Sequence, residues 1–162
     1  MKQTRLYNVI FPIWLLFMVP AVWLIVLPAN LIVDCAVVLL TLTALKHTQK
    51  KAVLKQVWWG VWLMGFAADF VGALFLLPAM FMAGYLPEPW DSWITPVMNN
   101  CWKSPLALLW TAAAVVLSGV CIYFFDRWGM RSCAELTNRE RHIVALTVAI
   151  VTAPWMFFIP TY

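Results

Sequence analysis

Charge is scarce in this sequence of 162 residues. Asp, Glu, Lys and Arg together make up 11% of the chain, whereas hydrophobic residues make up 64%. An average soluble domain is about one-quarter charged. This number of charged side chains is too small to cover the surface of an ordinary water-soluble globule. The composition therefore excludes a soluble domain and predicts an integral membrane protein.

Motifs that carry common enzyme chemistry are also missing. The four cysteines form no C-x-x-C pair, which excludes a thioredoxin-type redox motif and a standard zinc knuckle. The sequence has no glycine-rich phosphate loop, no nucleophile elbow and no H-E-x-x-H. His47 and His142 lie at the edges of apolar runs, whereas a haem would need axial ligands within the spans. We therefore expect no catalytic residue, no metal site and no cofactor.

Long apolar runs fill most of the chain. A helix needs about 20 residues to cross the roughly 30 Å hydrocarbon core of a bilayer. The runs predict a single membrane domain over residues 1–162, an all-α bundle of five transmembrane helices at about 6–27, 31–45, 57–79, 105–125 and 139–158. The stretch from Leu27 to Asn30 contains Pro28 and is typical of a turn, so we expect it to separate the first two spans.

Turn formers and aromatic residues mix in residues 80–103, between the third and fourth spans. Pro87, Glu88 and Pro89 precede Trp90 and Trp93, which lie one helical turn apart. Tryptophan side chains prefer the headgroup level of a bilayer. We therefore expect an interfacial loop on the outer face, anchored by these two tryptophans.

Three local signals mark the ends of the later spans. Pro105 suits the first turn of a helix, where its missing N–H is not needed. Thr137 and Glu140 have the T-x-x-E spacing of a capping box, so a helix should begin near residue 138. Pro154 lies inside the last span and predicts a kink or a break there.

The distribution of basic residues predicts the orientation. With the N-terminus in the cytoplasm, ten of the eleven basic residues fall on the cytoplasmic side: Lys2, Arg5, Lys46, Lys50, Lys51, Lys55, Arg127, Arg131, Arg139 and Arg141. Only Lys103 lies outside. This split follows the positive-inside rule and predicts that the C-terminus lies outside. The short loops and the single-signal N-terminus predict a bacterial-type plasma membrane. The clusters are too short for a nucleic-acid surface. Cys35 and Cys101 both fall on the outer side, which leaves a disulfide open.

Asp69 is the strongest candidate for a binding residue. It lies near the middle of the third span, where an ionised carboxylate costs at least about 2.5 kcal/mol. Gly65 and Gly72 share its helix face, so we expect them to let another helix approach closely. Two interpretations stay open. Asp69 binds an ion, a proton or a substrate, or it is a neutral, hydrogen-bonded group that joins two helices.

Asp34 is a second candidate binding residue, near the predicted outer end of the second span. There a helix N-terminus and interfacial water would help to stabilise its charge. A pair of membrane aspartates is similar to the site of an intramembrane aspartyl protease such as lipoprotein signal peptidase. The Asn-containing motifs around that family's aspartates are absent here, since the residues directly before Asp69 are Phe66, Ala67 and Ala68. The two aspartates are also predicted to lie at different depths, so a protease is not expected.

Three classes of function follow, in order of preference. The first is a transport or channel-type protein, or the membrane subunit of a transport system, with Asp69 as its polar centre. The second is a non-catalytic scaffold or accessory subunit that docks partners through the basic loops at 46–55 and 126–141. The third is an intramembrane enzyme. The expected partners are the lipid bilayer and a second membrane protein or another copy of this chain, and no nucleic acid.

Overall fold

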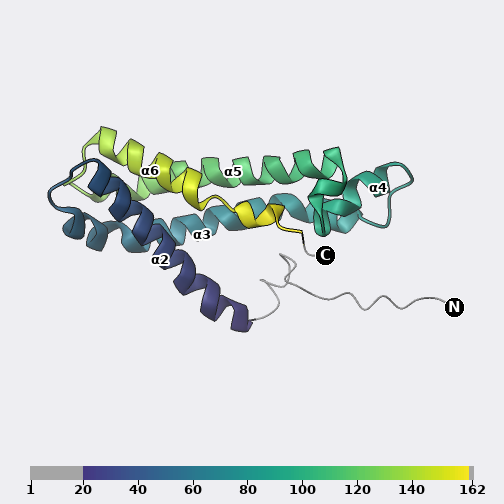
Figure 1. Ribbon diagram of the computed structural model, residues 1–162, viewed down its shortest axis with the longest axis horizontal. Helices are drawn as coiled ribbons and strands as arrows, with labels where there is room; N and C mark the ends of the chain where they lie inside the picture. The colour runs from purple at the N-terminus through teal and green to yellow at the C-terminus, as the bar shows by residue number, and fades with distance from the viewer. Residues whose placement is uncertain (1–19, 161–162) are drawn as a thin grey trace.

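The computed structural model describes residues 20–160, in which every regular element is helical. The α-helices are α2 (Pro20–Ala44), α3 (Lys50–Met82), α4 (Trp90–Ile94), α5 (Pro105–Gly129) and α6 (Asn138–Thr152). Four 3-10 helices join or extend them: η1 (Thr95–Met98), η2 (Cys101–Lys103), η3 (Met130–Ser132) and η4 (Trp155–Phe158). The long helices form an elongated antiparallel bundle, in which the start of α2 leans away from α3 (Figure 1).

Four of these helical segments are long and apolar enough to cross a membrane: Leu24–Ala44, Lys50–Met82, Pro105–Ser132 and Asn138–Phe158. Large apolar side chains point outward from them, among them Ile32, Leu40, Leu109 and Phe124, each at least 60% exposed. A soluble bundle would bury such residues, whereas lipid tails accept them. The chain is therefore a small polytopic α-helical membrane protein.

The predicted turn at residues 27–30 is wrong, because α2 runs through Pro28 without interruption. Proline removes one N–H donor, and a membrane helix tolerates this loss where its neighbours compensate. Near this point the Trp62 indole donates a hydrogen bond of 3.0 Å to the Leu27 carbonyl, which ties α3 to α2. The described residues thus contain four spans instead of five. Residues 6–19 of the predicted first span lie outside them.

The helix-end signals are confirmed. Helix α5 begins at Pro105, with Ser104 as its N-cap. The capping box forms at the start of α6, where Glu140 N donates to Thr137 Oγ1 (3.3 Å) and Thr137 N donates to Glu140 Oε2 (2.9 Å). Helix α6 ends at Thr152, and the chain resumes as η4 after Pro154.

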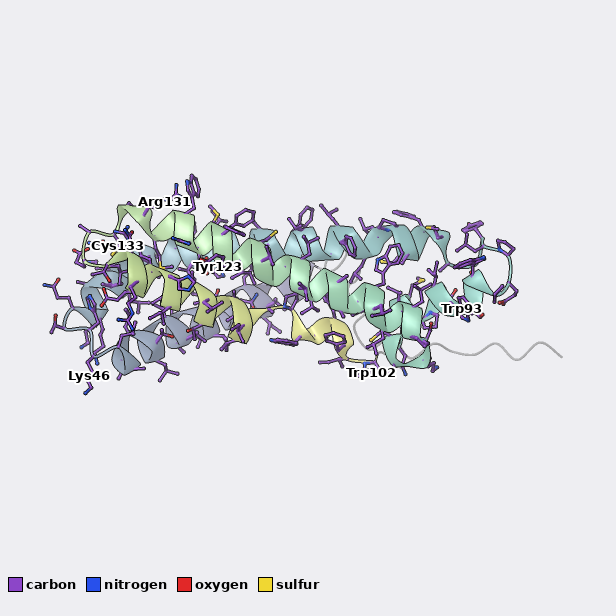
Figure 2. All side chains as sticks on the ribbon, turned by 90° about the horizontal axis from the view of Figure 1, so that it is seen from above. Lys46, Trp93, Trp102, Tyr123, Arg131 and Cys133 are labelled. Carbon is purple, nitrogen blue, oxygen red and sulfur yellow. The ribbon has the colours of Figure 1, made fainter. Side chains whose placement is uncertain are left out.

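The two ends of the bundle differ in chemistry. The basic end carries the α2–α3 and α5–α6 connections, with Lys46 and Arg131 exposed there (Figure 2). The aromatic end carries α4 and η2, with Trp93 and Trp102 exposed (Figure 2). The rings of Trp90 and Trp93 meet edge to face with centroids 5.5 Å apart. This separation is typical of a helical protein that spans a bilayer and keeps both ends at an interface.

Candidate functional site

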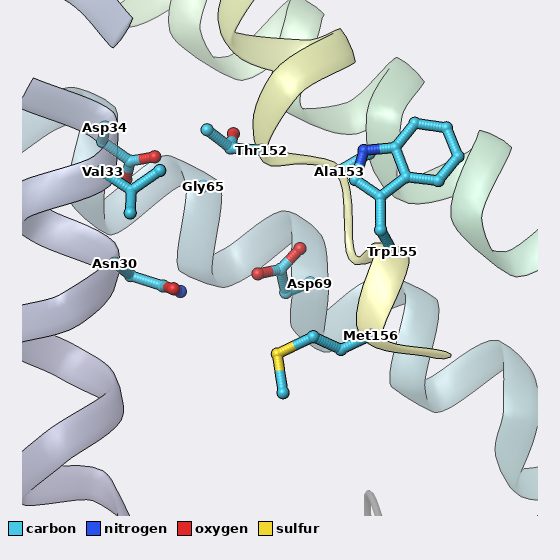
Figure 3. A pocket seen from close by; sticks show the side chains of 9 residues that line it. All are labelled: Asn30, Val33, Asp34, Gly65, Asp69, Thr152, Ala153, Trp155 and Met156. Carbon is cyan, nitrogen blue, oxygen red and sulfur yellow. The ribbon is translucent and has the colours of Figure 1, made fainter. Parts of the chain in front are cut away.

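A cavity of about 190 Å³ lies between α2, α3 and the junction of α6 with η4. A buried water needs on the order of 10–15 Å³ of such space, so the cavity has room for several waters. Its walls are Asn30, Val33, Asp34, Gly65, Asp69, Thr152, Ala153, Trp155 and Met156 (Figure 3). Two of these residues are acidic and none is basic.

Asp69 reaches this cavity from the middle of α3. Its carboxyl group points into the space between α2 and η4 (Figure 3). Oδ1 of Asp69 is buried and has no hydrogen-bond partner among the protein groups. A buried polar atom without a partner is rare in folded proteins and calls for an unseen water, proton or ion. In the structural interpretation, hydrogen bonds join Asp69 to a neighbouring helix. No such hydrogen bond is made at Oδ1.

Asp34 lies in the same cavity, which corrects its predicted position near the outer end of a span. Because α2 begins at Pro20, Asp34 falls in the interior of that helix, and only 6% of its surface is exposed. A Cβ atom placed on Gly65 of α3 would lie 3.6 Å from Asp34 Oδ2. Gly65 therefore lets α3 pass close to this carboxyl. Although they come from different helices, Asp34 and Asp69 thus line one cavity.

Thr152 brings a hydroxyl from the last residue of α6 to Asp34. The same hydroxyl donates a hydrogen bond of 2.9 Å to the Val148 carbonyl. A hydroxyl has a single proton to donate. The proton of the Thr152 hydroxyl is therefore used within α6, while the residue itself lines the cavity beside Asp34.

The break after α6 shapes the third wall of the cavity. Pro154 ends the helical path, and η4 places Trp155 and Met156 against the cavity (Figure 3). The Trp155 indole donates a hydrogen bond of 3.0 Å to the Ile150 carbonyl, which fixes the ring across the break. Sequence reasoning found the break at Pro154 but did not connect it to the aspartates.

Asn30 was also missed as a lining residue. It precedes Asp34 by four residues on α2, just as Gly65 precedes Asp69 by four residues on α3. Residues four apart share a helix face, so the Asn30–Asp34 spacing was a usable signal. It was hidden because Asn30 was assigned to a turn.

Gly72 faces a different neighbour from Asp69. A Cβ atom on Gly72 would overlap Ser118 Oγ of α5 and lie 3.2 Å from the Ala114 carbonyl. At the same crossing, the Ser118 hydroxyl donates a hydrogen bond of 3.1 Å to the Ala68 carbonyl. Gly72 therefore allows close α3–α5 packing, while Gly65 and Asp69 face the cavity.

Asp126 is a third buried aspartate, and sequence reasoning placed it at the start of a cytoplasmic loop. Helix α5 continues to Gly129, so Asp126 lies inside it with no exposed surface. Neither of its carboxyl oxygens has a hydrogen-bond partner among the protein groups. It follows Ser118 and Ile122 at four-residue spacing, which places all three on the buried face of α5.

Other site types find little support in the part of the chain that the structure describes. Within residues 20–160, no three His, Cys, Asp or Glu side chains gather as a metal-binding group. All four cysteines are free, so the disulfide between Cys35 and Cys101 is not formed. Comparisons with known protein families, curated proteins and solved structures give no match.

Proposed function

We propose that this protein is a small transport-type membrane protein in which Asp69 and Asp34 bind a proton or a small cation. The observation that carries the proposal is the buried Asp69 oxygen, which faces a cavity with room for water and has no protein partner. A carboxyl that only joined two helices would use that oxygen in a hydrogen bond. An intramembrane carboxyl beside a cavity with room for several waters is typical of an ion or proton pathway.

The position of Asp69 along α3 supports this function. At 1.5 Å per residue, Asp69 lies about 28 Å from the start of α3 at Lys50 and about 20 Å from its end at Met82. It is therefore remote from both ends of the bundle. A charge at such a depth interacts with a potential applied across the membrane, which a charge at the surface does not.

The pairing of the carboxyls favours a positively charged occupant. Two carboxylates in a site of low dielectric constant repel each other, and each costs solvation free energy. No basic side chain lines the cavity to offset that charge. A proton or a small cation in the cavity supplies the missing positive charge, and its release and uptake provide a transport step.

The orientation belongs to the same proposal. Eight of the nine basic residues in residues 20–160 lie in or next to the connections at the basic end, so we assign that end to the cytoplasm. Helix α6 then runs outward, which puts the end of η4 on the outer side. With the basic end in the cytoplasm, a cytoplasmic N-terminus requires a fifth span before Pro20. That span is a prediction from the sequence. The bacterial-type plasma membrane also stays a prediction.

Ion flux into liposomes tests the function. The purified protein is reconstituted with an entrapped pH-sensitive or sodium-sensitive dye, and a potassium diffusion potential drives positive charge inward. We expect the wild-type protein to carry one of the two ions and Asp69→Asn to lose that flux. Asp91→Asn, the same chemical change in the α4 region, is the matched control and should keep it. Flux in Asp69→Asn equal to wild type contradicts the proposal.

A docking function is the second candidate, and the basic end gives it a specific observation. Hydrogen bonds join the α5–α6 connection to the start of α3 and the connection before it. His47 Nε2 donates to the Glu135 carbonyl (3.0 Å), and Gln56 Nε2 of α3 donates to Glu135 Oε1 (2.9 Å). A fixed basic surface suits a protein partner or anionic lipid. Loss of a co-purifying protein on Lys50→Glu, but not on Asp69→Asn, would favour this function.

A further inference from the structure

We propose that Asp126 is the inner station of a proton path that leads from the cavity to the basic end, with Asp69 and Asp34 as the preceding stations. The proposal rests on the proposed function and narrows its cargo to a proton. Within residues 20–160, it assigns a role to the fully buried carboxyl that does not line the cavity.

The packing of α3 against α5 fixes the level of Asp126. Ser118 Oγ donates to the Ala68 carbonyl, and Trp110 Nε1 donates to the Phe75 carbonyl at 3.1 Å, so the two helices are antiparallel. Asp69, next to Ala68, is therefore level with Ser118. Asp126 follows Ser118 by eight residues, so it lies about 12 Å closer to the basic end.

Asp34 lies between these two levels. Its carboxyl faces Gly65, which is one turn, or about 6 Å, closer to the basic end than Asp69. A further turn of similar length then separates Asp34 from the level of Asp126.

The last part of the path is short. Asp126 precedes the end of α5 at Gly129 by three residues, which is about 5 Å along the helix. Beyond Gly129 the chain enters η3 and the connection at the basic end. Along the bundle axis, the three carboxyls are thus staggered from the cavity toward the basic end in steps of about one helical turn.

Asp126 has no visible role in holding the fold together. Its two oxygens make no hydrogen bond to the protein, and its side chain has no exposed surface. Asp91 shows the contrast, because its Oδ1 accepts hydrogen bonds from Gly84 N and Thr95 Oγ1 and thereby shapes the α4 region. A buried polar group without a partner destabilises a fold, so a structural requirement does not explain Asp126.

The stagger of the carboxyls selects a proton as the cargo. A metal cation needs several oxygen ligands around one point, whereas these carboxyls are spaced along the bundle axis. A single carboxyl can carry one proton. In each transfer the donor's O–H bond breaks and an O–H bond forms on the next carboxyl, directly or through a bridging water. The donor becomes a carboxylate and the acceptor becomes neutral, so charge and atoms balance without an oxidant.

Proton flux in liposomes tests the role of Asp126, with Asp126→Asn, Asp126→Glu and Glu135→Gln compared with wild type. Asn cannot carry the proton, so we expect Asp126→Asn to lose flux. Glu keeps a titratable carboxyl, so Asp126→Glu should retain it in part. Glu135→Gln removes a carboxylate at the basic end that lies outside the proposed path, so it should leave flux unchanged. Because Asp126 makes no hydrogen bond that the substitution would remove, Asp126→Asn should also fold. Its unfolding temperature should be at or above that of the wild-type protein.

The outcomes separate this inference from the proposed function. Loss of flux in Asp69→Asn with wild-type flux in Asp126→Asn overturns the role of Asp126 and keeps the cavity as the site. Sodium flux without proton flux in the wild-type protein overturns the proton path alone. Absence of both fluxes in the wild-type protein overturns the proposed function as well. If Asp126→Asn fails to fold, Asp126 is structural, and the inference is wrong.

Discussion

A carboxyl group at the surface and one in the membrane interior meet different demands. Asp91 is satisfied by a backbone N–H and a hydroxyl, and Glu140 by the capping box of α6. Asp69 and Asp126 each keep buried oxygens without protein partners. In an apolar interior such a group is costly unless a proton, a water or an ion accompanies it. The proposed function is therefore assigned to the carboxyls that the packing leaves without a partner.

Cys133 provides a prediction on pH dependence at the basic end. Burial raises the pKa of the Cys133 thiol above its usual value, and its hydrogen bond of 3.3 Å to Glu135 Oε2 acts in the same direction. The reactive thiolate is therefore depleted near neutral pH. Glu135→Gln removes the carboxylate, so it should lower the pKa and speed maleimide labelling of Cys133 at fixed pH. Equal labelling rates in the two proteins would show that access alone limits the reaction.

The sequence predicted Asp69 and missed Asp126 for a physical reason. Asp69 interrupts a long apolar run, so its burial follows from its neighbours in the chain. Asp126 is followed directly by Arg127, and a charged pair at the end of a span resembles the start of a loop. Only the packing of α3 against α5 shows that Asp126 faces inward while Arg127 is exposed. Local composition cannot supply this information.

At the scale of helices, close α3–α5 contact at Gly72 gives a prediction on stability. A Cβ atom there would overlap Ser118 Oγ and crowd the Ala114 carbonyl, so Gly72→Ala should destabilise the protein by about 1–3 kcal/mol. Gly60→Ala is the matched control on the same helix, because a Cβ atom there meets nothing within 4 Å. Alanine favours helix over glycine, so the control should stabilise by roughly 0.5–1 kcal/mol.

Reversible unfolding in detergent, followed by circular dichroism, measures both variants. A Gly72→Ala protein as stable as Gly60→Ala would mean that α5 shifts to accept the methyl group. The α3–α5 contact would then be looser than the structure shows.

Helix ends were predictable where a local motif determines them, as at Pro105 and at the Thr137–Glu140 capping box. The start of α2 was not, because Pro28 signals a turn in water but is tolerated inside a membrane helix. That error moved Asp34 to an interface and separated it from Asp69. The cavity also depends on the break at Pro154, whose direction no local pattern specifies.

At the scale of the whole molecule, the separation of the basic and aromatic ends predicts which end a membrane-impermeant thiol reagent reaches from outside the cell. Ser132 is exposed at the basic end, so Ser132→Cys offers an accessible probe there, whereas the native Cys133 is buried. In intact cells, a membrane-impermeant maleimide should leave this cysteine unlabelled until the membrane is opened. A cysteine at exposed Tyr85, near α4, is the matched outer control and should label at once. The reverse pattern contradicts the orientation.

Size and shape place limits on how the protein works. Its long helices leave large apolar side chains exposed to lipid. The cavity is bounded by three of these helices, α2, α3 and α6 with η4. Among the described residues, the carboxyl groups with buried, unsatisfied oxygens, Asp69 and Asp126, lie inside the bundle. The proposed function therefore depends on whether the interior carboxyls change their protonation state.

Infrared difference spectroscopy of the protein in liposomes measures that change directly, because a protonated carboxyl has a C=O stretching band that a carboxylate lacks. We expect a band from Asp69 that appears and disappears as the pH is cycled within the range where the protein stays folded, and that is missing in Asp69→Asn. A band that persists unchanged through the cycle would mean a permanently protonated Asp69. That result would contradict a carboxyl that takes up and releases an ion.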